Sequence, residues 1–133
     1  MRAFICVDDD LGRLFGSRRQ SRDGTLCADM LKTVGDGLLY IEKYSEPLFS
    51  DFAEKVCVCA DPPKDDSYFF FEKTDPEIYG RFVSEWTVYR WNRLYPSDEK
   101  FSKELLRGFR LTATEEFVGS SHEKITKEVY VRE

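Results

Sequence analysis

Three arginines stand within five residues of a chain whose formal net charge at pH 7 is -5. They are Arg18, Arg19 and Arg22, and they lie between an apolar run that predicts the first strand and an amphipathic run that predicts the first helix. Guanidinium groups and the free N–H groups at the start of a helix both attract anions. The segment therefore predicts a site for phosphate or carboxylate, unless the arginines pair with the acidic run at residues 8–10.

A second polar stretch, residues 119–126, holds the only histidine, His122, in a turn between two predicted strands. Histidine exchanges a proton near neutral pH, and Lys124 can stabilise developing negative charge. The hydroxyls of Ser120 and Ser121 can donate hydrogen bonds to phosphate oxygens. We expect this turn to approach the arginines and to supply metal-independent acid–base chemistry. The alternative is a polar hairpin turn whose side chains satisfy local backbone groups.

Three further residues are candidates for a catalytic or ligand-binding role. Asp23 stands at the start of the first predicted helix, where it is either a catalytic carboxylate or the cap of that helix. Asn92 and Arg93 lie between Trp91 and Tyr95. They could hold an aromatic ring or a nucleobase, or they could belong to a capped hairpin with aromatic packing.

The composition favours one domain, residues 1–133, because a chain of this length with 41% hydrophobic residues buries roughly two-thirds of its unfolded surface. No run approaches the roughly 20 apolar residues of a membrane span, and the N-terminal apolar run is too short for a signal peptide. We therefore expect a cytoplasmic protein that does not bind a membrane. The acidic excess argues against stable binding to duplex nucleic acid, but a protein partner stays open.

The four cysteines, Cys6, Cys27, Cys57 and Cys59, stand among apolar residues and suit the role of small core hydrophobes in a cytosolic protein. The Cys57-x-Cys59 pair has the wrong spacing for zinc and only one histidine to recruit. The sequence therefore predicts neither a metal nor a cofactor.

Hydrophobic periodicity predicts the elements. Apolar runs predict strands at residues 2–8, 38–44, 56–60, 68–71, 82–91, 109–117 and 125–132. Helical spacing predicts one helix from Ser21 or Asp23 to about residue 33 and a short one opened by Pro47. We expect strand 56–60 to be fully buried and residues 11–20 to form a loop over a ligand. The fold class is α/β, a mixed, mostly parallel sheet with two flanking helices and a C-terminal antiparallel hairpin.

A buried first strand, a glycine-containing loop and a helix whose early turn carries Asp23 resemble the substrate side of dihydrofolate reductase, where a carboxylate contacts the pterin. Tyr95-Pro96-Ser97-Asp98-Glu99-Lys100-Phe101 resembles the connection before that family's final hairpin, and Tyr130-Val131-Arg132 its closing strand. The chain thus looks like a shortened, dihydrofolate reductase-like domain. The family's cofactor half carries a Gly-Arg-x-Thr turn and a Gly-Gly pair. Residues 60–66 and 72–80 have neither, which argues against NADPH binding.

The strings GSRRQSRD, YRWNRLYPSD and GSSHEKIT are also similar to those of a group of short, uncharacterised bacterial proteins. No activity follows from that similarity. Our first hypothesis is a reductase-like domain without a nicotinamide site that binds a small phosphorylated or nucleotide-like anion through the arginines and the His122 turn. The second is a non-catalytic interaction protein of the inhibitor or immunity type, and the third is an NADPH-dependent pterin reductase.

Overall fold

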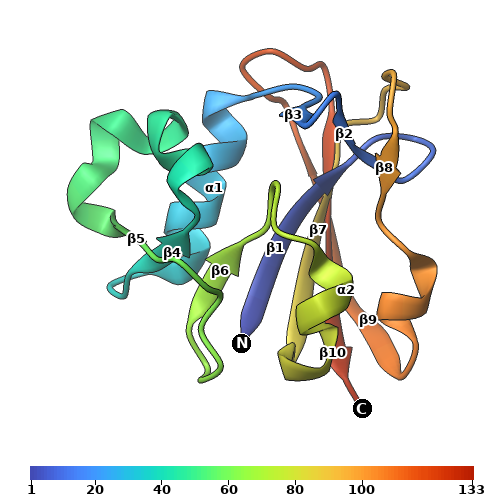
Figure 1. Ribbon diagram of the computed structural model, residues 1–133. Coiled ribbons are helices and arrows are strands. Elements are labelled where there is room, and N and C mark those ends of the chain that lie inside the picture. The colour runs from blue at the N-terminus through green and yellow to red at the C-terminus, as the bar shows by residue number, and fades with distance from the viewer.

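The computed structural model describes residues 1–133 (Figure 1). Its main element is a seven-stranded sheet. Its strands in chain order are β1 (Arg2–Val7), β4 (Leu39–Ile41), β5 (Val56–Val58), β6 (Tyr68–Phe70), β7 (Glu85–Arg90), β9 (Phe109–Phe117) and β10 (Ile125–Arg132). Their order in space is β5-β4-β6-β1-β7-β10-β9. The first strand of the chain therefore lies in the middle of the sheet.

One strand of this sheet, β10, runs opposite to the other six. Every pairing from β5 to β7 is parallel, whereas β10 pairs antiparallel with both β7 and β9. Parallel neighbours need long crossover connections, and the helices of the first half supply them. The predicted mixed, mostly parallel sheet with a C-terminal antiparallel hairpin is confirmed.

The two predicted flanking helices are α1 (Gly24–Val34) and η1 (Lys43–Lys55), and both pack on one face of the sheet. Their apolar residues share a core cluster with Phe4 of the central strand. The second helix is a series of 3-10 turns, because the backbone angles at Phe49 and Phe52 are not helical. None of the helices has both the length and the apolar character needed to cross a membrane.

Short helices cover the opposite face. These are α2 (Pro76–Tyr79), η2 (Gly80–Phe82) and η3 (Lys103–Leu106). Beneath them, Trp86 of the sheet meets Phe101 edge to face at 5.2 Å between ring centroids. A second core thus forms from aromatic side chains rather than from a long helix.

The segment 11–20, expected to be a loop, forms part of a small second sheet instead. The strands are β2 (Gly12–Phe15), β3 (Arg18–Arg19) and β8 (Glu99–Lys100), in the order β3-β2-β8. Two of the three arginines, Arg18 and Arg19, therefore form a short edge strand. The strand from the second half of the chain, β8, pairs with the other side of β2.

Asp8 explains why this segment folds back. Its Oδ1 accepts the N–H groups of Asp10 (2.9 Å) and Gly12 (2.7 Å). Its Oδ2 accepts from the Gln20 amide (2.9 Å) and the Tyr95 N–H (3.2 Å). Burial opposes its ionisation, but these hydrogen bonds outweigh burial and hold the pKa of Asp8 below its usual value. This carboxylate closes a turn and does not pair with an arginine.

The strand predicted at 56–60 is not fully buried. It is β5, the outermost strand on one side of the sheet, and Val58 is 38% exposed. It pairs only with β4, so its other edge has no neighbouring strand.

Candidate functional site

Asp23 joins the start of α1 to the turn between β9 and β10. Its Oδ1 accepts the N–H groups of Thr25 (3.0 Å) and Leu26 (3.2 Å), so this residue caps the helix. The same carboxylate accepts the N–H of Ser120 at Oδ1 (3.0 Å) and that of Ser121 at Oδ2 (2.8 Å). One side chain therefore holds two segments from opposite ends of the chain.

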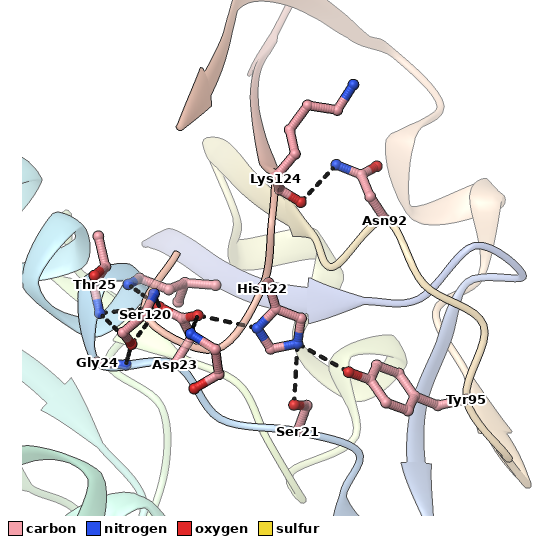
Figure 2. Close-up of polar contacts among 11 residues, drawn as sticks. Ser21, Asp23, Gly24, Thr25, Asn92, Tyr95, Ser120, His122 and Lys124 are labelled. Carbon is pink, nitrogen blue, oxygen red and sulfur yellow. Dashed lines mark hydrogen bonds and ion pairs between the residues drawn. The ribbon is translucent and has the colours of Figure 1, made fainter. Parts of the chain in front are cut away.

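His122 lies beside this carboxylate (Figure 2). Its Nδ1 is 3.0 Å from Oδ2 of Asp23, and the two side chains are 2% and 0% exposed. Its Nε2 is 3.1 Å from the Ser21 hydroxyl and 2.9 Å from the Tyr95 hydroxyl. The imidazole stacks on Trp91 with 4.5 Å between ring centroids. Every edge and one face of the ring is therefore in contact with the protein.

The hydrogen bonds around Asp23 fix the arrangement of protons. Burial opposes its ionisation, but the hydrogen bond from His122 and those from the backbone of the turn outweigh burial and hold the pKa of Asp23 well below its usual value. An ionised carboxylate is only an acceptor, so Nδ1 of His122 carries a proton. In the neutral ring, Nε2 then has one lone pair, for which the hydroxyls of Ser21 and Tyr95 compete.

A glycine permits the close approach of the turn. A Cβ at Gly119 would lie 2.8 Å from Cδ1 of Ile125 and would overlap the carboxylate of Asp23. Next in the chain, the Ser120 hydroxyl donates to Oδ1 of Asp23 (3.1 Å) and accepts the N–H of Gly24 (2.9 Å). The polar atoms of this serine are thus engaged by the start of the helix.

The three arginines take separate positions. Arg19 forms a forked ion pair with Glu72, with both N–O distances at 2.9 Å, and its guanidinium lies 4.2 Å from the ring centroid of Tyr44. Burial lowers the pKa of Arg19, but the interaction with Glu72 outweighs it, so that pKa is raised. Arg18 and Arg22 are exposed and form no ion pair.

Three predicted site residues lie outside the His122 cluster. The Lys124 side chain points away from the imidazole (Figure 2), and its Nζ is 3.6 Å from the carboxylate of Glu116. Asn92 donates to the carbonyl oxygen of Lys124 (3.1 Å), which fastens the two turns together. Arg93 is exposed on the surface. These positions agree with the alternative interpretation, in which the turns at residues 91–95 and 119–126 are polar hairpin turns and not one shared catalytic centre.

A narrow cavity lies between β1, α1, η1 and the end of β6. Its space is about 20 Å³, enough for about one or two water molecules. Apart from Arg22, the charged residues around it are already paired: Glu72 is bound by Arg19, and its carbonyl oxygen accepts from Arg13 (2.9 Å). Burial raises the pKa of the Cys27 thiol in its wall to about 11. The cleft on this side of the sheet is therefore nearly filled by the chain's own side chains.

Arg18 lines a different, open hollow of about 520 Å³. The residues around it are Gly16, Ser17, Arg18, Arg19, Tyr44 and Lys73. The Lys73 ammonium lies 4.6 Å from the ring centroid of Tyr44, so this ring contacts two cationic groups. No carboxylate lines the hollow. We refer to it as the Tyr44 hollow.

Sequence reasoning missed several of these residues. Tyr44 and Lys73 are distant from Arg18 along the chain, and no spacing rule connects them. Ser21 was considered only as a helix cap, and Tyr95 only as an aromatic neighbour. The pattern Ser-x-Asp two residues apart was visible, but its meaning depends on a histidine that the fold brings to it.

Three consecutive backbone N–H groups after β6 converge on the carboxylate of Glu42. Those of Glu72 and Thr74 donate to Oε2 at 3.0 and 3.1 Å, and that of Lys73 donates to Oε1 at 3.0 Å. Successive N–H groups of this kind form an anion-binding concavity. A side chain of the same chain occupies this one, so it does not face a ligand.

No model of a known protein family matches this sequence, and no curated protein is significantly similar to it. In structure, 207 solved chains are significantly similar. One is dihydrofolate reductase from Enterococcus faecalis, solved in complex with NADP(H) and RAB-propyl, with a TM-score of 0.65 and 8% identity over 98% of this chain and 95% of that one. The fold is therefore dihydrofolate reductase-like, as the resemblance in the sequence predicts. At this identity the likeness shows the fold alone.

The residues of this chain do not fit a nicotinamide dinucleotide beside the first helix. The cleft is nearly filled by the pair of Arg19 and Glu72, and the N–H groups that could hold a phosphate after β6 are bound by Glu42. The glycine turns of the family are also missing from the sequence. We therefore derive no hydride-transfer step for this protein.

Proposed function

We propose that this protein binds a small phosphorylated or nucleotide-like anion in the Tyr44 hollow. The observation that supports it is the presence of two cations without ion-pair partners, Arg18 and Lys73, in one open hollow that no carboxylate lines. A guanidinium binds phosphate oxygens by forked hydrogen bonds, and an ammonium binds them as a point charge.

The charge of the hollow is local. Glu72 balances the charge of Arg19, so Arg18 and Lys73 supply the uncompensated positive charge in a chain of net charge -5. The Tyr44 ring, which contacts Arg19 and Lys73, also lines the hollow. A ligand that joins a phosphate to a planar ring matches this combination.

The proposal keeps part of the site expected from sequence. Arg18 and Arg19 stay in it, whereas the turn around His122 does not, because its N–H groups and hydroxyls are engaged by Asp23. Arg22 lines the narrow cavity and not the hollow.

Titration calorimetry with pyrophosphate and with adenosine monophosphate tests the proposal. We expect binding that weakens with salt, and a loss of affinity of about ten- to a hundredfold for each of Arg18→Gln and Lys73→Gln, since a hydrogen bond to a charged group contributes about 1.5–3 kcal/mol. Arg110→Gln, a change at an exposed arginine on β9, is the control and should bind as the parent does. Absence of heat with both probes, or equal affinity of all variants, would contradict the proposal.

A non-catalytic interaction protein is the second candidate. The nearly filled cleft favours it over a reductase, because such a molecule presents surfaces rather than a deep pocket. A basic partner that co-purifies and dissociates with salt, together with no response to either probe, would support this candidate. A pterin reductase would instead consume NADPH in the presence of dihydrofolate, and we expect no such consumption.

A further inference from the structure

We propose that Ser21, His122 and Asp23 form a triad of nucleophile, base and orienting carboxylate that cleaves small carboxylic esters. The inference goes beyond the anion site and does not depend on it, because neither Arg18 nor Lys73 of the Tyr44 hollow takes part.

The distances along the triad carry the inference. The Ser21 hydroxyl is 3.1 Å from Nε2 of His122, and Nδ1 of the same ring is 3.0 Å from Oδ2 of Asp23. Both lie within hydrogen-bonding reach for an activated nucleophile. The same succession of contacts is found in serine hydrolases on unrelated folds, so it is recognised by geometry and not by position in the chain.

Two of the three side chains are enclosed, and the nucleophile is less buried, as a hydrolase requires. Asp23 and His122 are enclosed, so the carboxylate can orient the ring and stabilise the imidazolium that forms. Ser21 is only half-buried and lines the narrow cavity. The member of the triad that a substrate must touch is thus the least buried of the three.

Arg22 supplies the positive charge that stabilises the intermediate of the reaction. It follows the nucleophile directly, lines the same cavity, is exposed and has no ion-pair partner. A guanidinium beside the attacked carbonyl can stabilise the negative oxygen of the tetrahedral intermediate. The substrate class is therefore a small ester that reaches Ser21 from the surface.

Hydrolysis of the ester needs no reagent other than water. The Ser21 oxygen forms a bond to the carbonyl carbon, the carbonyl electron pair moves to its oxygen, and the serine proton passes to Nε2 of His122. When the carbon–oxygen double bond reforms, the bond to the leaving alcohol breaks and Nε2 returns the proton to that alcohol. Water then attacks the acyl-serine by the same route and releases the carboxylic acid.

Tyr95 competes with the nucleophile in the resting protein. A ring nitrogen has one lone pair, and the tyrosine hydroxyl lies 2.9 Å from Nε2. Tyr95→Phe leaves that lone pair to Ser21 alone, so this variant should react faster than the parent. A purely structural role of His122 gives no reason for such an increase.

Labelling with diisopropyl fluorophosphate, followed by intact-mass and peptide analysis, tests the triad in the full chain. The probe is uncharged, so its reaction is independent of anion binding. We expect one adduct, at Ser21, that is absent from Ser21→Ala and forms about a hundredfold more slowly in His122→Gln. Ser50→Ala, at an exposed serine of η1, is the matched control and should be labelled as the parent is.

Three results would overturn the inference: no adduct at Ser21, an equal rate in a folded His122→Gln, or an adduct on Tyr95 in place of the serine. If His122→Gln does not fold, the Tyr95→Phe variant decides, since an unchanged or lower rate there contradicts the competition for Nε2. Calorimetry with pyrophosphate on the same samples reports the Tyr44 hollow separately, so failure of one proposal is distinguishable from failure of the other.

Discussion

His122 and Asp23 are 99 positions apart, and a 3.0 Å hydrogen bond between Nδ1 and Oδ2 joins them in a fully enclosed site. The bond attaches the turn between β9 and β10 to the N-cap residue of α1. It also sets the ring so that Nε2 faces the hydroxyls of Ser21 and Tyr95. The arrangement at this edge of the sheet therefore depends on one buried carboxylate.

Replacing that carboxylate should be costly. Asp23→Ala removes the acceptor of four backbone N–H groups and of the histidine, so we expect a loss of about 3–5 kcal/mol in the free energy of unfolding. Urea denaturation measures it. The control is Asp36→Ala, at an exposed aspartate without contacts, for which the change should stay within about 0.5 kcal/mol. Equal midpoints for the two variants would contradict the role assigned to Asp23.

Stability should fall in acid. The pKa of Asp23 is lower in the folded protein than its usual 3.8, so the unfolded chain binds the proton more readily. The stabilisation is present above about pH 4 and is lost as the pH falls toward the folded pKa. The difference in unfolding free energy between the parent and Asp23→Asn should therefore shrink below about pH 4. A difference that stays constant down to low pH would show that this carboxyl does not titrate as described.

Substitution by lysine should change the free energy of unfolding differently at the two neighbouring arginines of β3. Arg19→Lys cannot keep both hydrogen bonds to Glu72, so we expect a loss of about 1–3 kcal/mol. Arg18→Lys, which changes an exposed side chain without a partner, should stay within about 0.5 kcal/mol. Thermal or urea unfolding of the pair measures both. If the two substitutions cost the same, the forked ion pair does not contribute as inferred.

Removal of Glu42 should release the loop after β6. In Glu42→Ala the N–H groups of Glu72, Lys73 and Thr74 lose their acceptor, and we expect their hydrogen exchange to accelerate by about tenfold or more. Peptide-level exchange measured by mass spectrometry reports this loop. Glu54→Ala, at an exposed glutamate of η1, should leave its exchange unchanged.

Much of the fold was predictable because it depends on local patterns. Alternating and continuous apolar runs located the strands, and the order of helices and strands implied the parallel first half and the antiparallel hairpin. The cap of α1 was predictable as well, because an aspartate before a helix satisfies its first N–H groups whatever else surrounds it.

The prediction failed where a residue's neighbour comes from elsewhere in the chain. Residues 11–20 form a hairpin because Asp8 accepts the Gly12 N–H and the Gln20 side-chain amide within it, and because β8 pairs with β2. The strand at 56–58 lies at an edge because no further strand follows β5 in the sheet. A short apolar run looks the same in the sequence whether the strand lies in the middle of a sheet or at its edge.

The sequence by itself determined the strands of the main sheet, the class of that sheet and the start of the first helix near Asp23, since each follows from patterns within a few residues. Only the tertiary structure decided what the charged groups do: Arg19 meets Glu72, His122 meets Ser21, and Arg18 stays free beside Lys73. The physical reason is that the strength of an ion pair or hydrogen bond depends on distance, orientation and burial in space, and spacing along the chain specifies none of these for distant residues.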